Sequence, residues 1–182
     1  RTGRRKGNRK VGAIVGYTNA GKSTLLNTLT DAGVLSEDKL FATLDPTTRA
    51  LTLEDGQQVL LTDTVGFIRK LPHHLIEAFK STLEEAKYAD FIIHVVDASN
   101  PEMDTQMHIV YEILDELQAG DKQVITLFNK QDKLEEHAPA RDLRADYTIP
   151  VSAKTGEGME ELKSVLEKIL AEGQIYMERL FS

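Results

Sequence analysis

The 182-residue sequence contains no cysteine and no tryptophan. Disulfide bonds and thiolate metal sites are therefore excluded, and a lack of cysteine is typical of proteins in a reducing compartment. No apolar run approaches the roughly 20 residues that a membrane-spanning helix needs. The basic N-terminal stretch has no apolar segment behind it, so it does not match a secretory signal peptide. We therefore expect a cytoplasmic protein without a membrane span.

Acidic residues outnumber basic ones, and the imbalance is uneven along the chain. The net charge is −7, yet residues 1–10 hold only basic charges. The remaining residues carry 16 basic and 29 acidic groups, a net charge of −13. A basic arm on an acidic body indicates contact with RNA or another polyanion, whereas a solvated linker would have the same composition. The sequence leaves both interpretations open.

Alternating strand and helix patterns predict an α/β fold with a mostly parallel sheet and helices on both faces. Apolar runs predict strands over residues 11–15, 49–54, 58–62, 91–96, 123–128 and 147–151. Helical periodicity predicts helices over residues 24–32, 75–88, 103–117 and 159–170. Asp55-Gly56 joins two of the strands and is a strong hairpin signal, so we expect one antiparallel edge strand.

The most informative motif is Gly16-Tyr17-Thr18-Asn19-Ala20-Gly21-Lys22-Ser23, which fits the phosphate-loop pattern G-x-x-x-x-G-K-[ST]. It lies between a predicted strand and a predicted helix, a context that a chance glycine turn would lack. Glycines let the backbone approach phosphate oxygens, and N–H groups of the loop and of the helix start, Thr24 included, face the anion. Lys22 is expected to reach the β- and γ-phosphates, and the Ser23 hydroxyl to ligate Mg²⁺.

Residues after other strands can face the same ligand, because ligands of open α/β sheets bind beyond the carboxyl ends of the strands. The predicted strand 58–62 is followed by Asp63-Thr64-Val65-Gly66. Asp63 can hold the Mg²⁺ shell through water, and the Gly66 N–H can approach a γ-phosphate. By itself, this motif is equally typical of an ordinary turn at a strand end.

Two further motifs follow the last two predicted strands: Asn129-Lys130-Gln131-Asp132 and Ser152-Ala153-Lys154. The Asp132 carboxylate can accept hydrogen bonds from N1–H and the exocyclic amine of guanine, a donor pair that adenine lacks. The Lys130 stem can lie against the base, Asn129 can tie the purine edge to the phosphate loop, and a backbone N–H of residues 152–154 can reach the guanine O6. The motifs occur in the right order at the right strand ends. GTP and GDP are therefore the expected ligands, and an ATPase is disfavoured.

Together these motifs resemble the small-GTPase superfamily of the translation-factor-related type, which implies a three-layer P-loop NTPase (Ras-like) fold with a six-stranded sheet. Three stretches are more specifically similar to the GTPase domain of the HflX family, ribosome-associated GTPases related to the Obg group. They are residues 16–23, Phe41-Ala42-Thr43-Leu44-Asp45-Pro46-Thr47-Thr48-Arg49 and Asp63-Thr64-Val65-Gly66-Phe67-Ile68-Arg69-Lys70-Leu71-Pro72.

The resemblance implies a GTP-binding domain over residues 11–172, between a basic linker (1–10) and a C-terminal tail (173–182). It places the nucleotide-sensing loop on residues 41–45, with Thr43 as the second protein ligand of Mg²⁺ beside Ser23. From residue chemistry alone, Thr43, Thr47 and Thr48 can each reach the metal. The expected catalytic residues are Lys22, Thr43 and Gly66.

The family also implies a partner. Its members act as nucleotide-dependent switches on the large ribosomal subunit and its RNA, splitting or rescuing stalled or idle ribosomes, and they carry an additional N-terminal domain. The sequence starts at Arg1 and contains no such N-terminal domain, so we expect a piece of a longer protein. We also expect this piece to be a monomer.

Phe67 stands where Ras-like GTPases place a water-orienting glutamine, directly after D-x-x-G. A phenyl ring cannot accept a hydrogen bond from water, so weak intrinsic hydrolysis is expected. Asn19 would compensate by ligating K⁺, which offsets charge between the phosphates, or would only brace the loop; both remain open. His73 and His74 would approach the site after rearrangement or lie on the surface at a helix start.

A second function fits the same residues. If hydrolysis is incidental, the domain is a guanine-nucleotide sensor whose partner docks on the apolar side chains Phe67, Ile68 and Leu71.

Overall fold

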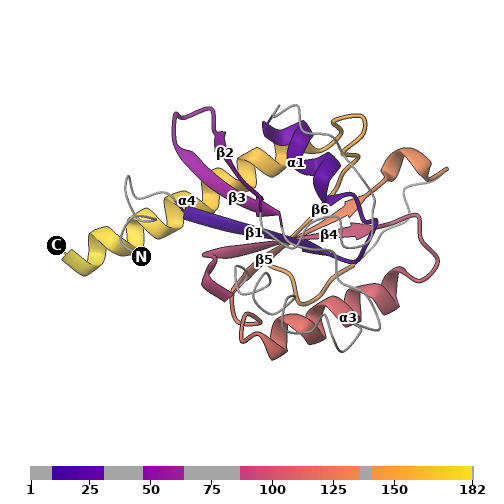
Figure 1. Cartoon of the computed structure of the whole chain (residues 1–182). Helices are drawn as coiled ribbons and strands as arrows, with labels where there is room; N and C mark the ends of the chain where they lie inside the picture. Colours follow the sequence, from indigo (N-terminus) through magenta and orange to yellow (C-terminus); the bar gives the residue numbers. More distant parts are fainter. Residues whose placement is uncertain (1–9, 31–46, 64–86, 136–140, 182) are drawn as a thin grey trace.

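The computed structural model describes residues 10–30, 47–63, 87–135 and 141–181 (Figure 1). Within these ranges, six strands form one sheet in the order β2-β3-β1-β4-β5-β6. They are β1 (Lys10–Gly16), β2 (Thr47–Thr52), β3 (Gln58–Asp63), β4 (Phe91–Asp97), β5 (Gln123–Asn129) and β6 (Tyr147–Pro150). β2 runs antiparallel to β3, and the other neighbouring pairs are parallel. The predicted mostly parallel sheet with one antiparallel edge strand is confirmed.

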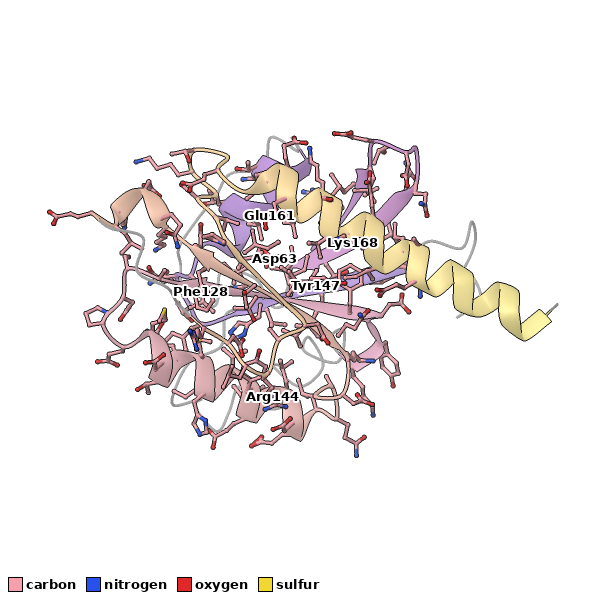
Figure 2. The ribbon with its side chains drawn as sticks, turned by 180° about the vertical axis from the view of Figure 1, so that it is seen from behind. Asp63, Phe128, Arg144, Tyr147, Glu161 and Lys168 are labelled. Carbon is pink, nitrogen blue, oxygen red and sulfur yellow. The ribbon has the colours of Figure 1, made fainter. Side chains whose placement is uncertain are left out.

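The helices form two layers around this sheet, as the α/β pattern predicts. They are α1 (Lys22–Thr30), α3 (Met103–Glu116) and α4 (Met159–Phe181), with a 3₁₀ turn, η3 (Gln131–Lys133), after β5. α1 and α4 lie on one face and α3 on the other (Figure 1). Seen from behind, Glu161 and Lys168 mark α4 on one side of the sheet and Arg144 lies on the α3 side (Figure 2).

The strand sequences explain why both faces are covered. Along β4, Phe91, Ile93 and Val95 belong to the core under α1 and α4, whereas Ile92 faces the α3 layer. Since successive strand residues point to opposite faces, a continuous apolar strand requires a packed layer on each side. The first six residues of β4 are all buried, which agrees with that requirement.

The closing helix supplies much of the larger core. Its predicted apolar stripe is buried throughout: Met159, Leu162, Leu166, Ile169 and Leu170. The α4 backbone then continues through Gly173 to Phe181, across the residues assigned to a tail, and extends beyond the sheet (Figure 1). One glycine lowers helix stability by about 1 kcal/mol, which is too little to end a helix by itself.

The turn between β2 and β3 has the predicted hairpin chemistry. The Asp55 carboxylate accepts a hydrogen bond from the Gln57 N–H at 3.0 Å. Gly56 has φ +88°, a left-handed conformation that glycine adopts at little cost.

Two predicted helices are described only in part. The helix expected over residues 24–32 is described up to Thr30, and of the helix expected over 75–88 only Lys87 and Tyr88 lie within the described residues, where they are helical. None of the helices in the described part of the chain has both the length and the apolarity that crossing a membrane requires.

Candidate functional site: a phosphate loop facing a base loop

The carboxyl ends of β1, β3, β4 and β5 bring together motifs that are far apart in the sequence. The register places Ile14 of β1 beside Asp63 of β3, and Asp97 of β4 beside Asn129 of β5. The turn after β6 adds Ser152, Ala153 and Lys154. Because parallel strands end at one edge of a sheet, these polar residues share one rim.

The phosphate loop connects β1 directly to α1. Asn19 and Gly21 have φ angles of +69° and +106°, so the loop backbone is left-handed at both residues. A Cβ at Gly16 would lie 2.7 Å from the Val95 carbonyl oxygen, which explains why glycine begins the loop. Lys22 is only 9% exposed at the first position of α1. The loop is thus a compact turn whose N–H groups precede a helix N-terminus, an arrangement that favours anions.

Tyr17, Thr18, Ala20, Ser23 and Thr24 complete this loop and the helix start. The Ala20 N–H donates to the Tyr17 carbonyl oxygen at 3.1 Å, which closes the turn. Ala20 and Gly21 are buried, Tyr17, Thr18, Ser23 and Thr24 are half-buried, and Asn19 is exposed.

A carboxylate from β3 reaches the start of α1. The Ser23 hydroxyl donates a hydrogen bond to Asp63 Oδ2 at 3.3 Å. The other oxygen, Oδ1, is buried and has no hydrogen-bond partner among the described residues. Burial raises the pKa of Asp63, against the opposing effects of the Lys22 charge and the Ser23 hydrogen bond. A buried carboxylate oxygen without a donor, beside a serine hydroxyl, fits the oxygen shell of a hydrated Mg²⁺ ion.

Asn129 ties three loops together. Its amide nitrogen donates to the Ala20 carbonyl oxygen at 2.9 Å, and its amide oxygen accepts from the Ala153 N–H at 2.9 Å. The side chain is 2% exposed, so both bonds are shielded from water. A Cβ at Gly21 would lie 2.4 Å from the Asn129 amide nitrogen, so the phosphate loop needs glycine there to admit this side chain.

Lys130 forms a second link to the phosphate loop. Its ammonium donates to the Asn19 carbonyl oxygen at 2.8 Å and lies 3.2 Å from Asp97 Oδ2. The Lys130 backbone is left-handed, with φ +69°, which turns the chain from β5 into η3.

Gln131 and Asp132 complete the base loop. The Gln131 N–H donates to the Val151 carbonyl oxygen at 3.1 Å, which holds the loop against the end of β6. Asp132 is exposed, and its Oδ1 accepts a hydrogen bond from the Ser152 hydroxyl at 2.8 Å. That bond is the main cause that lowers the pKa of Asp132, so the group is an ionised acceptor at neutral pH. Lys154 follows in the same turn and is exposed.

Several predicted site residues lie outside the described ranges. They are Phe41, Ala42, Thr43, Leu44, Asp45, Thr64, Val65, Gly66, Phe67, His73 and His74. The sensing loop, the second metal ligand and the residue in place of glutamine therefore stay predictions.

Asp97 is a site residue that the sequence reasoning missed. It ends β4 and lies beside both Asn129 and Lys130. The signal was available, because Asp97 directly follows a buried apolar strand, as Asp63 and Asn129 do.

Comparison with known proteins agrees with this geometry. The family described as 50S ribosome-binding GTPase matches residues 11–130. A GTPase HflX from Lacrimispora saccharolytica is 68% identical over 170 residues, which are 93% of this chain and 40% of that protein. The chain spans about two fifths of the length of the curated relatives that it matches.

Solved structures share the fold and carry guanine nucleotides. A GTP-binding protein from Sulfolobus solfataricus in complex with GDP is 30% identical, with a TM-score of 0.73 over 90% of this chain and 53% of that chain. Era in complex with MgGDPNP and a segment of 16S ribosomal RNA is 28% identical, with a TM-score of 0.66 over 88% of this chain and 57% of that chain. The chain belongs to the family of 50S ribosome-binding GTPases, in its HflX group.

Proposed function

We propose that the rim of loops described above holds Mg²⁺-bound GTP, and that hydrolysis to GDP switches the affinity of the protein for the large ribosomal subunit. The observation that carries this proposal is the Asn129 bridge. It fixes the base loop to the phosphate loop at Ala20 and to the turn after β6 at Ala153. One side chain thereby sets the distance between the places where a guanine base and its phosphates bind.

The phosphate loop supplies the binding of the triphosphate. Residues 16–24 present backbone N–H groups and the N-terminus of α1 to the anion, and Lys22 adds a positive charge at the β- and γ-phosphates. In the transition state, charge spreads over the transferred phosphoryl group, so a cation fixed by its place on α1 stabilises it without rearrangement.

Mg²⁺ would be held by Ser23 directly and by Asp63 through water, with Thr43 as the second protein ligand. Buried Asp63 Oδ1, without a donor among the described residues, supports this assignment. When bound, the ion neutralises charge on the phosphate oxygens. Ser23 and Asp63 would hold the ion together, because the hydrogen bond between them places both side chains side by side.

Guanine selectivity would come from Asp132. Its carboxylate is ionised, exposed and oriented by Ser152, which leaves acceptor capacity for the two donors of guanine. Lys130 would cover one face of the base, and the 152–154 turn would donate a backbone N–H to O6.

The experiment that tests the base site is Asp132→Asn. Preference is expected to move from GTP to xanthosine triphosphate, because the amide can donate to the added carbonyl oxygen of xanthine. Unchanged guanine preference in competition binding would refute the assignment.

Hydrolysis without a glutamine needs another group. We propose K⁺, ligated through Asn19, because this residue is exposed within the phosphate loop. Turnover measured in K⁺ and in Na⁺ at equal ionic strength tests this; equal rates would leave Asn19 with a bracing role only.

The ribosomal role is supported by the family description and by the basic segment 1–10. It would be exercised in the cytoplasm by a longer parent protein, since this chain covers only 40% of its Lacrimispora saccharolytica relative. GTP turnover titrated with large ribosomal subunits, on this chain and on the parent, separates an enzyme from a sensor. Stimulated turnover supports the switch, whereas negligible turnover with ribosomes present supports a sensor docking through Phe67, Ile68 and Leu71.

A further inference from the structure

We propose that Asp97 is a positioning residue for guanine-nucleotide binding: its carboxylate holds the Lys130 ammonium against the phosphate loop. This inference rests on the proposed nucleotide site and adds to it a residue from β4, a strand that contributes none of the binding motifs.

The two oxygens of the Asp97 carboxylate have different partners. Asp97 Oδ2 lies 3.2 Å from the Lys130 ammonium, which itself donates to the Asn19 carbonyl oxygen at 2.8 Å. Asp97 Oδ1 accepts hydrogen bonds from the Ser99 N–H at 2.9 Å and from the Ser99 hydroxyl at 2.6 Å. Since Ser99 holds one oxygen in place, the other is fixed in the direction of Lys130.

Shielding makes this ion pair stronger than a typical surface pair. The side chains of Lys130 and Asp97 are 21% and 13% exposed. Exposed pairs contribute little because water screens them and because two long side chains must be ordered, whereas here Ser99 and the Asn19 carbonyl have already ordered both partners. Groups of the protein alone therefore hold the Lys130 ammonium in a defined position.

That position matters because Lys130 belongs to both halves of the site. Its backbone follows Asn129 in the base loop, its stem would lie against the base, and its ammonium contacts the phosphate loop. Without the Asp97 charge, the ammonium would lose its fixed partner and the long stem would sample other rotamers. The base would then lose a preordered wall, and the nucleotide would dissociate faster.

A purely structural role would come from the Ser99 turn instead. In that case Asp97 would matter only as the acceptor that shapes the chain between β4 and α3. Asp97→Asn distinguishes the two roles, because the asparagine oxygen still accepts from Ser99 while its NH₂ group replaces the charge that faces Lys130. Ser99→Ala is the matched control, because the hydroxyl bond to Oδ1 is lost while the backbone N–H of residue 99 still donates to Oδ1 and keeps the carboxylate directed at Lys130.

The experiment measures the dissociation rate of fluorescent GDP from the Mg²⁺-loaded protein by stopped-flow. We expect Asp97→Asn to accelerate dissociation roughly tenfold, Ser99→Ala less than about twofold, and Asp97→Glu, which keeps the charge, less than about threefold. In a Lys130→Met background, Asp97→Asn should add no further acceleration, because the pair is already broken.

Three results would overturn the proposal: an unchanged rate in Asp97→Asn, a Ser99→Ala rate as fast, or an equal acceleration in the Lys130→Met background. If Asp97→Asn does not fold, as judged by circular dichroism, Asp97→Ala, which also removes the charge, replaces it in the cycle with Lys130→Met. Asp132→Asn, assayed in parallel, distinguishes a failure of this inference from a failure of the proposed nucleotide site. If it shifts preference to xanthine nucleotides while Asp97→Asn has no effect, the site holds and only this inference is wrong.

Discussion

At the scale of single residues, backbone conformation decides which side chains the site admits. Gly21 and Gly56 both have positive φ angles, +106° and +88°. They differ in their surroundings, since a Cβ at Gly21 would meet the Asn129 amide at 2.4 Å, whereas a Cβ at Gly56 would meet nothing within 4 Å. The pair therefore separates backbone strain from damage to the Asn129 bridge.

Gly21→Ala is expected to weaken GDP binding by at least about tenfold, because Asn129 must move away from Ala20. Gly56→Ala should cost about 1 kcal/mol of unfolding free energy from the left-handed conformation and leave GDP affinity unchanged. Isothermal titration calorimetry and urea unfolding measure the two quantities. Equal affinities in both glycine variants would contradict the role given to the bridge.

Residue identities at the site were predictable where a motif fixes their spacing, as in the phosphate loop and in Asn129–Asp132. The contact between Lys130 and Asn19 could not be predicted, because its acceptor is a backbone carbonyl oxygen. Every residue has this group, so the amino-acid type at position 19 does not indicate the contact. The orientation of such a carbonyl follows from the left-handed φ angle of Asn19, which depends on the whole turn.

At the scale of elements, the α3 layer holds a buried polar cluster beside the apolar core. His94 of β4 packs edge-on against the Tyr111 ring of α3, with 5.1 Å between the ring centroids. The Tyr111 hydroxyl and the Thr126 hydroxyl both donate to Asp142 Oδ2, the latter at 2.6 Å. Arg144 lies over the Tyr111 ring at 4.5 Å (its side chain is labelled in Figure 2) and pairs with Asp115. The cluster fastens the segment at Asp142 and Arg144 to α3.

This cluster predicts acid sensitivity. Burial lowers the pKa of His94 from 6.5 to about 4, with the Asp142 charge acting in the opposite direction. The unfolded chain binds a proton at this residue below pH 6.5, whereas the folded chain does so only near pH 4. The contribution of His94 to stability is therefore complete above pH 6.5 and decreases as the pH falls toward 4. Between pH 7 and pH 5 the loss is about 2 kcal/mol.

In His94→Leu this part of the pH dependence should disappear. The measurement is the urea-unfolding free energy at pH 7 and pH 5, compared between the variant and the unaltered chain. His108→Gln, at an exposed histidine of α3, is the control and should keep the full difference. An unaltered pH dependence in His94→Leu would show that His94 is protonated without cost in the folded chain.

Periodicity predicted the elements better than their ends. The predicted ends of β4 and β5 lie within one residue of the observed ends, because runs of buried apolar side chains are compatible with few other structures. The helix predicted over residues 159–170 is too short, because glycine often follows a helix end, whereas α4 continues through Gly173 to Phe181. The buried polar cluster under α3 was also missed. In the sequence His94 is a single polar residue in an apolar strand, and Asp142, whose charge acts on it, lies 48 positions further along the chain.

At the scale of the whole molecule, the site joins β1, β3, β4, β5 and the turn after β6, so ligand binding should stabilise the domain as a unit. A ligand that binds only the folded state, at 1,000 times its Kd, adds about 4 kcal/mol to the unfolding free energy. GDP with Mg²⁺ should therefore raise the thermal midpoint, and ATP at the same concentration should not.

Removal of Mg²⁺ by EDTA should reduce the stabilisation by a non-hydrolysable GTP analogue, because the phosphates then repel one another and buried Asp63 faces them unscreened. Differential scanning fluorimetry measures all of these shifts. A midpoint that EDTA does not lower in the presence of the analogue would contradict the Mg²⁺ assignment to Ser23 and Asp63.

The Asn129 bridge has a consequence for how quickly nucleotide is captured. Its two hydrogen bonds join groups of the protein to one another, so folding of the chain itself meets the entropy cost of aligning the two halves of the pocket. The site is therefore preorganised, and nucleotide binding does not require the two loops to rearrange. Association should then be limited by encounter, and the lifetime of the complex by how often this amide releases the loop.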